Sequence, residues 1–316
     1  MKRFFATLLL WPLLAAAQTF PSRPIQMLVP YPAGGTTDVM ARSLQEPMQK
    51  AFGQTVVIEN KSGASGVLAA REVARGKPDG QTLLFINSGI VSVTPHVQKD
   101  AGFDGVKDFA PVALATMAPL FVIVPGNLPV TDLKSYIEWA KKQPNLSYAT
   151  AGVGSFGHLA SELFLKSAGL KMTHIPYRGQ APTTNAVLTG EVALLITSMS
   201  SAMRGFIDGG KLKLLAVTAA VPSPQTPGVP TVGSVLPGYV AETWFGWVTT
   251  AGTPPDVINR LNSEINTILG TKDIQDRMSA LGQQVRTMTP AQLGALIAED
   301  SARWGQVVRD NNISAQ

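Results

Sequence analysis

Short apolar runs that resemble strands alternate with longer helix-like segments along most of this 316-residue chain. The runs at residues 25–30 and 55–60, for example, flank a helix-like segment at residues 38–52, which ends before Gly53. Such alternation is typical of α/β proteins, in which helices flank mainly parallel sheets. The sequence therefore predicts an α/β fold with mainly parallel sheets.

The same pattern continues along the rest of the chain. Further strands are predicted within residues 79–89, 119–127, 146–150, 172–176, 192–197 and 212–218, and helices at residues 66–75, 131–142, 253–269, 273–281 and 290–311. Residues 222–238 hold five prolines and three glycines, which predicts an irregular surface connector. A chain of this length exceeds what one hydrophobic core usually supports, so two domains are predicted.

The N-terminus has the pattern of an export signal. Lys2 and Arg3 precede an apolar run at residues 4–14, and small residues at 15–17 precede Gln18. This pattern predicts a signal peptide over residues 1–17, with cleavage before Gln18. A buried N-terminal helix is the alternative. The apolar run is too short for a membrane span, which needs about 20 apolar residues. We expect an exported, soluble protein without a lipid anchor, because no cysteine follows the cleavage site.

Composition narrows the chemistry of the protein. The chain has no cysteine, which excludes disulfides and thiolate metal sites. Its formal charge is +5, and it falls to +3 once Lys2 and Arg3 are removed. No dense stripe of basic residues remains, so nucleic acid is not an expected partner. The small positive excess would instead help to attract anions.

Two glycine-rich loops follow strand-like runs and precede helix-like segments. The first contains Gly34 and Gly35 and then the capping residues 36–38, and the second spans residues 151–155. Glycine allows backbone angles closed to other residues, and unpaired N–H groups at a helix start bind anions. Neither loop contains a lysine or arginine, which favours a carboxylate over a phosphate-rich ligand. Ordinary strand-to-helix turns remain the alternative interpretation.

Other readings of the second loop fit less well. Residues 152–157 match GxGxxG, but the next strand lacks the acidic residue that a dinucleotide site needs, so no cofactor is expected. Ser155 lies three positions before His158, outside the GxSxG pattern of hydrolases, although a triad assembled from distant segments is still open. The three histidines show no metal-ligand spacing, so no metal site is expected.

Six segments, taken together and in order, resemble one family. They read "IQMLVPYPAGGTTDVMAR", "VVIENKSGASGVLAAREVARGKPDGQTLLF", "KDFAPVAL", "LSYATAGVGSFGHLASELF", "HIPYRGQAP" and "PTVGSVLPGY…TWFGW". This combination closely resembles the Bug (TctC-like) family, the periplasmic receptors of tripartite tricarboxylate transporters. The resemblance implies a two-lobed clamshell in which the chain crosses between lobes twice. Lobe 1 would comprise residues 18–122 and 240–316, and lobe 2 residues 123–239.

The resemblance also implies a set of ligand-binding residues. Family members hold an organic carboxylate between the two loops, partly through ordered waters. Carried over position by position, the contacts are Tyr31, Ala33, Gly34, Gly35, Thr36, Asp38, Asn60, Gly63 and Ser88 in lobe 1, and Thr150, Ala151, Gly152 and Ser155, with His158 nearby, in lobe 2.

One segment departs from the family pattern. Where the family commonly has "DLLGGQVDLMFD", this chain has Ala186, Ala193 and Thr197 at the aspartate positions. Thr197 and Ser198 are predicted to end a strand at the cleft, near the far end of the ligand. The loss of an acid there argues against an amine-bearing ligand and favours a di- or tricarboxylate or an aromatic acid.

The combined reading is a non-enzymatic, monomeric receptor in the periplasm. It would bind a small organic carboxylate and deliver it to membrane transporter subunits, without a cofactor, a metal or nucleic acid. A similar clamshell serving as the sensor of a two-component system is the first alternative. A secreted hydrolase is the second.

Overall fold

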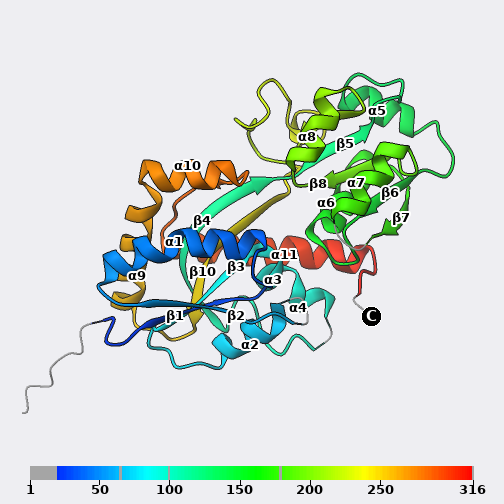
Figure 1. Cartoon of the computed structure of the whole chain (residues 1–316). Helices are drawn as coiled ribbons and strands as arrows, with labels where there is room; N and C mark the ends of the chain where they lie inside the picture. The colour runs from blue at the N-terminus through cyan, green and yellow to red at the C-terminus, as the bar shows by residue number, and fades with distance from the viewer. Residues whose placement is uncertain (1–19, 64–65, 99, 178–179, 315–316) are drawn as a thin grey trace, which may run out of the picture.

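The computed structural model describes residues 20–63, 66–98, 100–177 and 180–314, and it contains two α/β lobes (Figure 1). Lobe 1 is built on a six-stranded sheet of order β11-β4-β10-β3-β1-β2, and lobe 2 on a five-stranded sheet of order β7-β6-β8-β5-β9. The predicted signal peptide lies outside the described residues. Within them, no helix is both long enough and apolar enough to cross a membrane.

The elements of lobe 1 come from both ends of the chain. Its strands are β1 (Ile25–Val29), β2 (Val56–Asn60), β3 (Thr82–Asn87), β4 (Phe109–Pro119), β10 (Glu242–Thr250) and β11 (Gln284–Val285). Its helices are α1 (Thr36–Phe52), α2 (Val67–Ala74), α3 (Ser88–Ser92), α4 (Thr94–Val97), α9 (Pro255–Leu269), α10 (Lys272–Ala280) and α11 (Pro290–Asp310).

The elements of lobe 2 form one continuous stretch of chain. Its strands are β5 (Phe121–Pro125), β6 (Ser147–Thr150), β7 (Thr173–Pro176), β8 (Leu194–Thr197) and β9 (Leu212–Val217). Its helices are α5 (Leu133–Ala140), α6 (Phe156–Ala168), α7 (Gln180–Thr189), α8 (Ser201–Asp208) and the short 3₁₀ helix η2 (Val232–Ser234). The chain passes from β4 to β5 and returns from β9 to β10.

The predicted two-lobed α/β fold is confirmed, but the sheets are mixed, so the expectation of mainly parallel sheets was wrong. β1 pairs in parallel with β2 and β3, whereas β10 runs antiparallel to β3 and β4. In lobe 2, β6 pairs in parallel with β7 and β8, and β5 runs antiparallel to β8 and β9. Every antiparallel pair in the described sheets includes β4, β5 or β10, the strands beside the two crossings between the lobes.

The long crossing strands β4 and β10 are the main elements that the sequence pattern did not predict. β4 is almost entirely buried, and Trp244 and Trp247 of β10 are fully buried. A continuous apolar run has no period that distinguishes a buried strand from a buried helix. These two strands connect the lobes. They therefore form the side of the cleft at which the lobes are joined, called the hinge side below.

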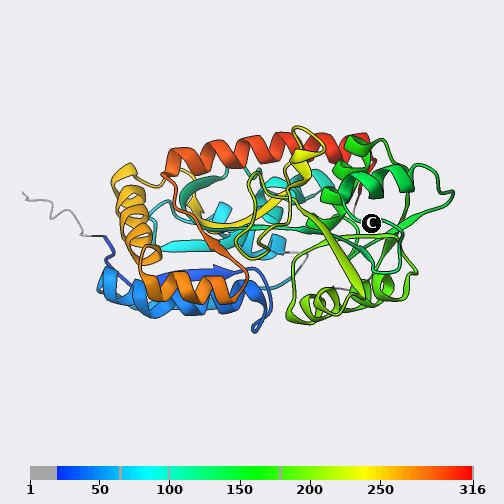
Figure 2. The same ribbon diagram turned by 90° about the horizontal axis from the view of Figure 1, so that it is seen from above.

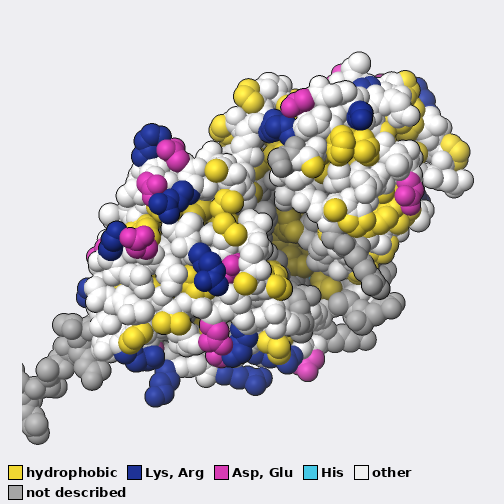
Figure 3. Space-filling view, in the orientation of Figure 1, with side chains coloured by type: hydrophobic (Ala, Val, Ile, Leu, Met, Phe, Trp, Pro, Cys, Tyr) yellow, Lys and Arg dark blue, Asp and Glu magenta, His cyan; other side chains and the backbone are white. Residues whose placement is uncertain are grey.

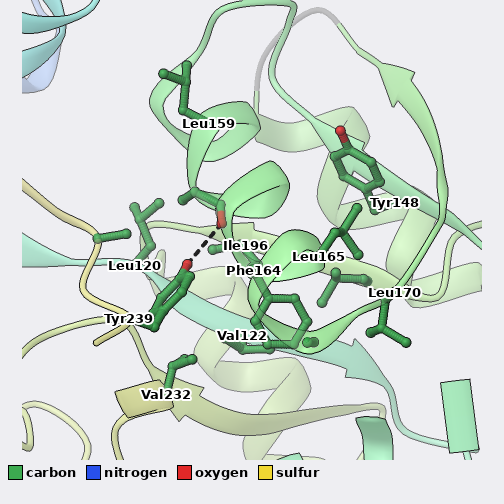
Figure 4. Close-up of a cluster of buried hydrophobic side chains, with 14 of the residues drawn as sticks. Leu120, Val122, Tyr148, Leu159, Phe164, Leu165, Leu170, Ile196, Val232 and Tyr239 are labelled. Atoms are coloured by element: carbon green, nitrogen blue, oxygen red, sulfur yellow. Dashed lines mark hydrogen bonds between the residues drawn. The ribbon is translucent and has the colours of Figure 1, made fainter. Parts of the chain in front are cut away.

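The strands near the cleft are apolar on both faces because helices cover both sides of each sheet. In β5, Phe121 and Ile123 join one buried cluster, and Val122 and Val124 join the cluster on the opposite face. Figure 4 shows the second cluster, in which the Tyr239 hydroxyl donates to the Ala160 carbonyl oxygen at 2.9 Å. This bond satisfies the only polar atom of a buried phenol side chain.

Helix α11 packs against both lobes (Figure 2). Near its start, Leu293 and Ile297 lie in a core cluster of lobe 1. Near its end, Trp304 and Val308 join the core cluster that surrounds β5, β6 and β8 of lobe 2. The helix thus spans the junction between the lobes. The exact residue boundaries of the two lobes stay a prediction.

Candidate ligand-binding cleft

Two adjoining cavities lie in the cleft between the lobes, which Figure 3 shows as a groove with hydrophobic side chains along its floor. The hinge cavity, next to β5, β8 and β10, has a volume of about 200 Å³. The loop cavity, next to the β6–α6 loop, has a volume of about 380 Å³. Five residues line both cavities and form their shared border: Asn87, Ala151, Ser155, Phe156 and Thr243.

The remaining walls come from both lobes. The loop cavity is completed by Tyr31, Gly89, Thr94, Gly152, Val153 and Gly154. The hinge cavity is completed by Leu120, Thr150, Gly157, Leu195, Ile196, Thr197, Ser198 and Phe245. None of the described residues that line either cavity carries a charge. An anion here would therefore be held by N–H and hydroxyl dipoles instead of by an ion pair.

The β6–α6 loop is ordered by its own side chains. Ser155 caps helix α6 by accepting a hydrogen bond from the His158 N–H at 3.3 Å. The Gly154 N–H donates to His158 Nδ1 at 3.1 Å, and Gly154 has a φ of +73°, which favours glycine. Phe156 and Gly157 begin α6 and line the hinge cavity. Their first-turn N–H groups have no partner within the helix, so this wall presents donors to an anion.

A pair of stacked histidines supports this loop from behind. The rings of His158 and His174 lie 3.9 Å apart at 14°, and His174 Nε2 is 2.7 Å from Thr150 Oγ1. Burial, with the neighbouring His174, lowers the pKa of His158 to about 4, and burial also lowers the pKa of His174. Both rings are therefore neutral near pH 7, and Nδ1 of His158 is free to accept from Gly154.

The β1–α1 loop is ordered by charge. The buried Asp38 carboxylate accepts from the Gly34 N–H at 2.8 Å, from Arg42 Nε at 3.0 Å and from Asn60 Nδ2 at 2.8 Å. Burial acts to raise the pKa of Asp38, but the bonds from Arg42, Gly34 and Asn60 outweigh it and lower the pKa. Asn60 Nδ2 also donates to the Tyr31 carbonyl oxygen. Asp38 and Asn60 thus hold the loop in shape.

The two glycines of the first loop differ in their backbone angles. Gly34 has a φ of +83°, as the sequence pattern predicted for a glycine turn. Gly35 has a φ of −76° as the N-cap residue of α1, so the expectation of a glycine-only conformation was wrong there. Only Gly34 therefore needs to be glycine for the turn itself.

The structure brings part of the predicted set of site residues together in the cavities. Those that line a cavity are Tyr31, Thr150, Ala151, Gly152, Ser155, Thr197 and Ser198. Those that line neither are Ala33, Gly34, Gly35, Thr36, Asp38, Asn60, Gly63, Ser88 and His158. Residues 33–36 are exposed on the first loop, whereas Ser88 and His158 are buried behind the walls.

Several lining residues were missed, and Asn87 is the most informative of them. Its Oδ1 accepts from the Tyr31 hydroxyl at 3.2 Å, so its Nδ2 donor group stays available, since no other described residue bonds to it. Burial raises the pKa of Tyr31 to about 12, which keeps that phenol protonated. The position of Asn87 at the end of a predicted strand was a signal for it. Thr243, 3.3 Å from Ser88 Oγ, lies on the unpredicted strand β10.

The Ser155 and His158 side chains do not form a nucleophile and base. His158 Nδ1 accepts from the Gly154 N–H, and His158 Nε2 lies 3.8 Å from Glu162 Oε1. A hydrolase needs its base within hydrogen-bond reach of the nucleophile. In the described part of the chain, no group of three histidine or acidic side chains is placed to hold a metal ion.

A family model and a sequence relative of this chain point to the same protein family. The family model of the tripartite tricarboxylate transporter family receptor (TctC) matches residues 40–313. Protein BugT of Bordetella pertussis is 35% identical over 93% of this chain and 91% of its own length.

Solved structures of the same family superimpose on nearly the whole chain. An R. palustris protein, Rpa4515, determined with adipate, has a TM-score of 0.76 at 32% identity over 93% of this chain and 99% of its own. A TctC solute-binding protein from Polaromonas, determined without ligand, has a TM-score of 0.83 at 29% identity over 92% and 100%.

Proposed function

Because the chain belongs to the tripartite tricarboxylate transporter receptor family, we propose that it is a periplasmic receptor for a small organic carboxylate. It binds the acid in the cleft between its lobes and delivers it, unchanged, to the membrane subunits of such a transporter. The lobes close over the ligand by bending of β4 and β10, the two strands that connect them.

The observation that carries this proposal is the donor set at the shared border of the two cavities. Asn87 Nδ2, the Ser155 hydroxyl and the first N–H groups of α6 meet there, in a cleft with no charged wall among the described residues. Hydrogen-bond donors at a helix N-terminus suit a carboxylate, which needs partners but no cation. The binding of adipate by a relative at 32% identity supports the same ligand chemistry.

The same arrangement supports a receptor that does not convert its ligand. The Ser155 hydroxyl caps α6, and the nearest imidazole, that of His158, is turned to the Gly154 N–H. The cleft thus offers binding groups without an activated nucleophile. The protein is expected to leave every carboxylate that it binds chemically intact.

Native mass spectrometry of the freshly purified protein, followed by a thermal-shift panel of carboxylates, tests this function. A ligand at a hundredfold excess over its Kd stabilises the fold by about 2.7 kcal/mol. The proposal predicts a clear rise in melting temperature with at least one carboxylate, and no product after prolonged incubation. Stabilisation by amines or sugars alone, or turnover of the acid, would contradict it.

A further inference from the structure

The hinge cavity has a different character from the border at which the donors meet. Four of the eight residues that line it beyond the border are apolar, namely Leu120, Leu195, Ile196 and Phe245, and Phe156 lies at the border itself. Phe156 packs edge-on against the buried Trp304 with centroids 5.0 Å apart, and Phe245 packs against Phe85 at 6.4 Å. Both rings are held by aromatic neighbours, so the apolar walls are preformed.

Several hydroxyl groups of this cavity are already engaged within the protein. Thr150 Oγ1 bonds to His174 Nε2 at 2.7 Å and donates to the Gly152 carbonyl oxygen at 3.1 Å. Thr243 Oγ1 lies 3.3 Å from Ser88 Oγ, and Thr197 Oγ1 accepts from Gln180 Nε2 at 3.4 Å. A second carboxylate inside the cavity would find no cation among the described residues that line it. With the first N–H groups of α6 bound to the carboxylate at the border, its donors would be the hydroxyls of Thr197 and Ser198. Burying an unpaired charge in such a place is strongly unfavourable.

We propose that the hinge cavity is the subsite for an uncharged, ring-sized apolar body, and that Phe156 and Phe245 determine this specificity. The inference rests on the proposed function, because it places the ligand's single carboxylate at the shared border, against Asn87 and Ser155. The ligand class is then an apolar or aromatic monocarboxylic acid. A body of this kind fills a cavity that a short acid such as acetate leaves empty.

The size of the cavity fits this class. The hinge cavity measures about 200 Å³, and an apolar protein cavity of about 150 Å³ accepts one benzene ring. Burying a side chain the size of phenylalanine is worth enough to tighten binding about 10- to 100-fold. Benzoate should therefore bind about 10- to 100-fold more tightly than acetate, and also more tightly than adipate or citrate.

Calorimetric titration of the full chain with acetate, benzoate, adipate and citrate tests the order of affinity. Benzoate as the tightest of the four supports the inference. Tighter binding of adipate or citrate would overturn the inference and leave the receptor for carboxylates standing. Binding of none of the four acids, together with no stabilising acid in the wider thermal-shift panel, would overturn both.

Matched phenylalanine variants locate the effect. Phe245→Leu shortens the wall of the hinge cavity and should lower benzoate affinity about tenfold without changing acetate affinity. Phe103→Leu is the control, because Phe103 is buried against Phe109 in lobe 1 and lines neither cavity. An equal ratio of benzoate affinity to acetate affinity in the wild type and in Phe245→Leu would overturn the assignment of the subsite.

A charge variant provides a second readout if Phe245→Leu folds poorly. Thr197 is half-buried at the end of β8 and lines the hinge cavity. Thr197→Lys places an ammonium group there and should shift the preference from benzoate toward adipate by about tenfold or more. An unchanged preference in this variant would mean that the far end of the ligand lies elsewhere.

Discussion

The two glycine loops share one sequence layout but are ordered by different physical means. The β1–α1 loop is tied down by a buried carboxylate, Asp38, which binds Arg42, Asn60 and the Gly34 N–H. The β6–α6 loop is tied down by a neutral imidazole, His158, and by the Ser155 cap. Most of the first loop is exposed, whereas residues 150–157 of the second lie along the cavities.

This difference teaches that a strand–glycine–helix pattern predicts a turn and a helix start, but not the role of the turn. In the second loop every contact that orders the loop is uncharged near pH 7. The positive end of the α6 dipole is therefore not neutralised by a carboxylate of the loop and can attract a ligand anion. In the first loop a carboxylate already accepts the Gly34 N–H. We therefore propose the second loop as the anion site, since the first loop contributes only Tyr31 to the cavity walls.

Removing the charge that orders the first loop should have the largest effect on stability. Asp38→Ala leaves Arg42, Asn60 and the Gly34 N–H without their shared acceptor. We expect the free energy of unfolding to fall by about 3 kcal/mol, as for a broken buried pair with one half-exposed partner. Urea denaturation measures this loss. The control Asp276→Ala, which breaks an exposed pair with Lys272, should cost less than about 1 kcal/mol, and equal losses would contradict the comparison.

Acid should weaken the second loop specifically. The fold lowers the pKa of His158 from 6.5 to about 4, so between these values the unfolded chain binds more protons than the folded protein. The contribution of neutral His158 to the free energy of unfolding is complete above about pH 6.5 and is lost as the pH falls toward 4. At pH 5 the loss amounts to about 2 kcal/mol.

The variant His158→Gln isolates this contribution. Its amide oxygen can accept from the Gly154 N–H but does not titrate. His174, whose pKa is also lowered by burial, is present in both proteins. Thermal denaturation between pH 7 and pH 4.5 should show a shallower fall for the variant than for the wild type. Parallel pH profiles would mean that His158 does not order the loop.

Ser155, which caps α6, and Thr36, the first residue of α1, should differ in their effect on binding. Ser155→Ala removes a helix cap, which costs about 1 kcal/mol of stability, and removes a hydroxyl at the border of the cavities. We expect about tenfold weaker carboxylate binding from the loss of one such bond to a charged group. Thr36→Ala, on the exposed loop, should change affinity less than about threefold. Calorimetric titration compares the two, and the reverse order would assign the anion to the first loop.

The smallest expected difference lies between two adjacent glycines. Gly34→Ala forces a side chain into a φ of +83° and should cost about 1 kcal/mol of stability. Gly35→Ala meets only the Pro32 carbonyl oxygen at an ordinary 3.5 Å, so its change should stay within about 0.5 kcal/mol. Thermal melts of the two variants decide this, and equal destabilisation would show that the turn is misassigned.

The sequence predicted the parts of this molecule that depend on local pattern. Alternating periodicity predicted the α/β fold, and capping residues predicted the helix start at Ser155. β4 was missed because its apolar run carries no period. β10 was missed because its polar residues, at both ends of the strand, do not alternate with its apolar ones. Phe156 and Phe245 were missed as lining residues because only the meeting of distant strands brings them to one cavity.

Residue identity also did not reveal which polar groups are already engaged. Asp38 and Ser88 are polar and lie near the cleft, yet both are bonded within lobe 1. Asn87, beside Ser88, keeps its donor group available because the Tyr31 hydroxyl binds its oxygen. The strand end signals the place of Asn87, but which of its atoms stays free depends on the packing of three segments and leaves no signal in the sequence.

The most direct test of the account is the charge variant Asn87→Asp. It preserves the shape of the side chain and an acceptor for Tyr31, but it replaces the proposed carboxylate donor by a negative charge. Two like charges about 4 Å apart near a protein surface repel by up to about 4 kcal/mol. Calorimetry with the tightest of benzoate, adipate and citrate should show at least about 100-fold weaker binding, while Asn185→Asp, on the exposed face of α7, binds like the wild type. Wild-type affinity in Asn87→Asp would contradict the claim that the carboxylate lies at the border of the two cavities.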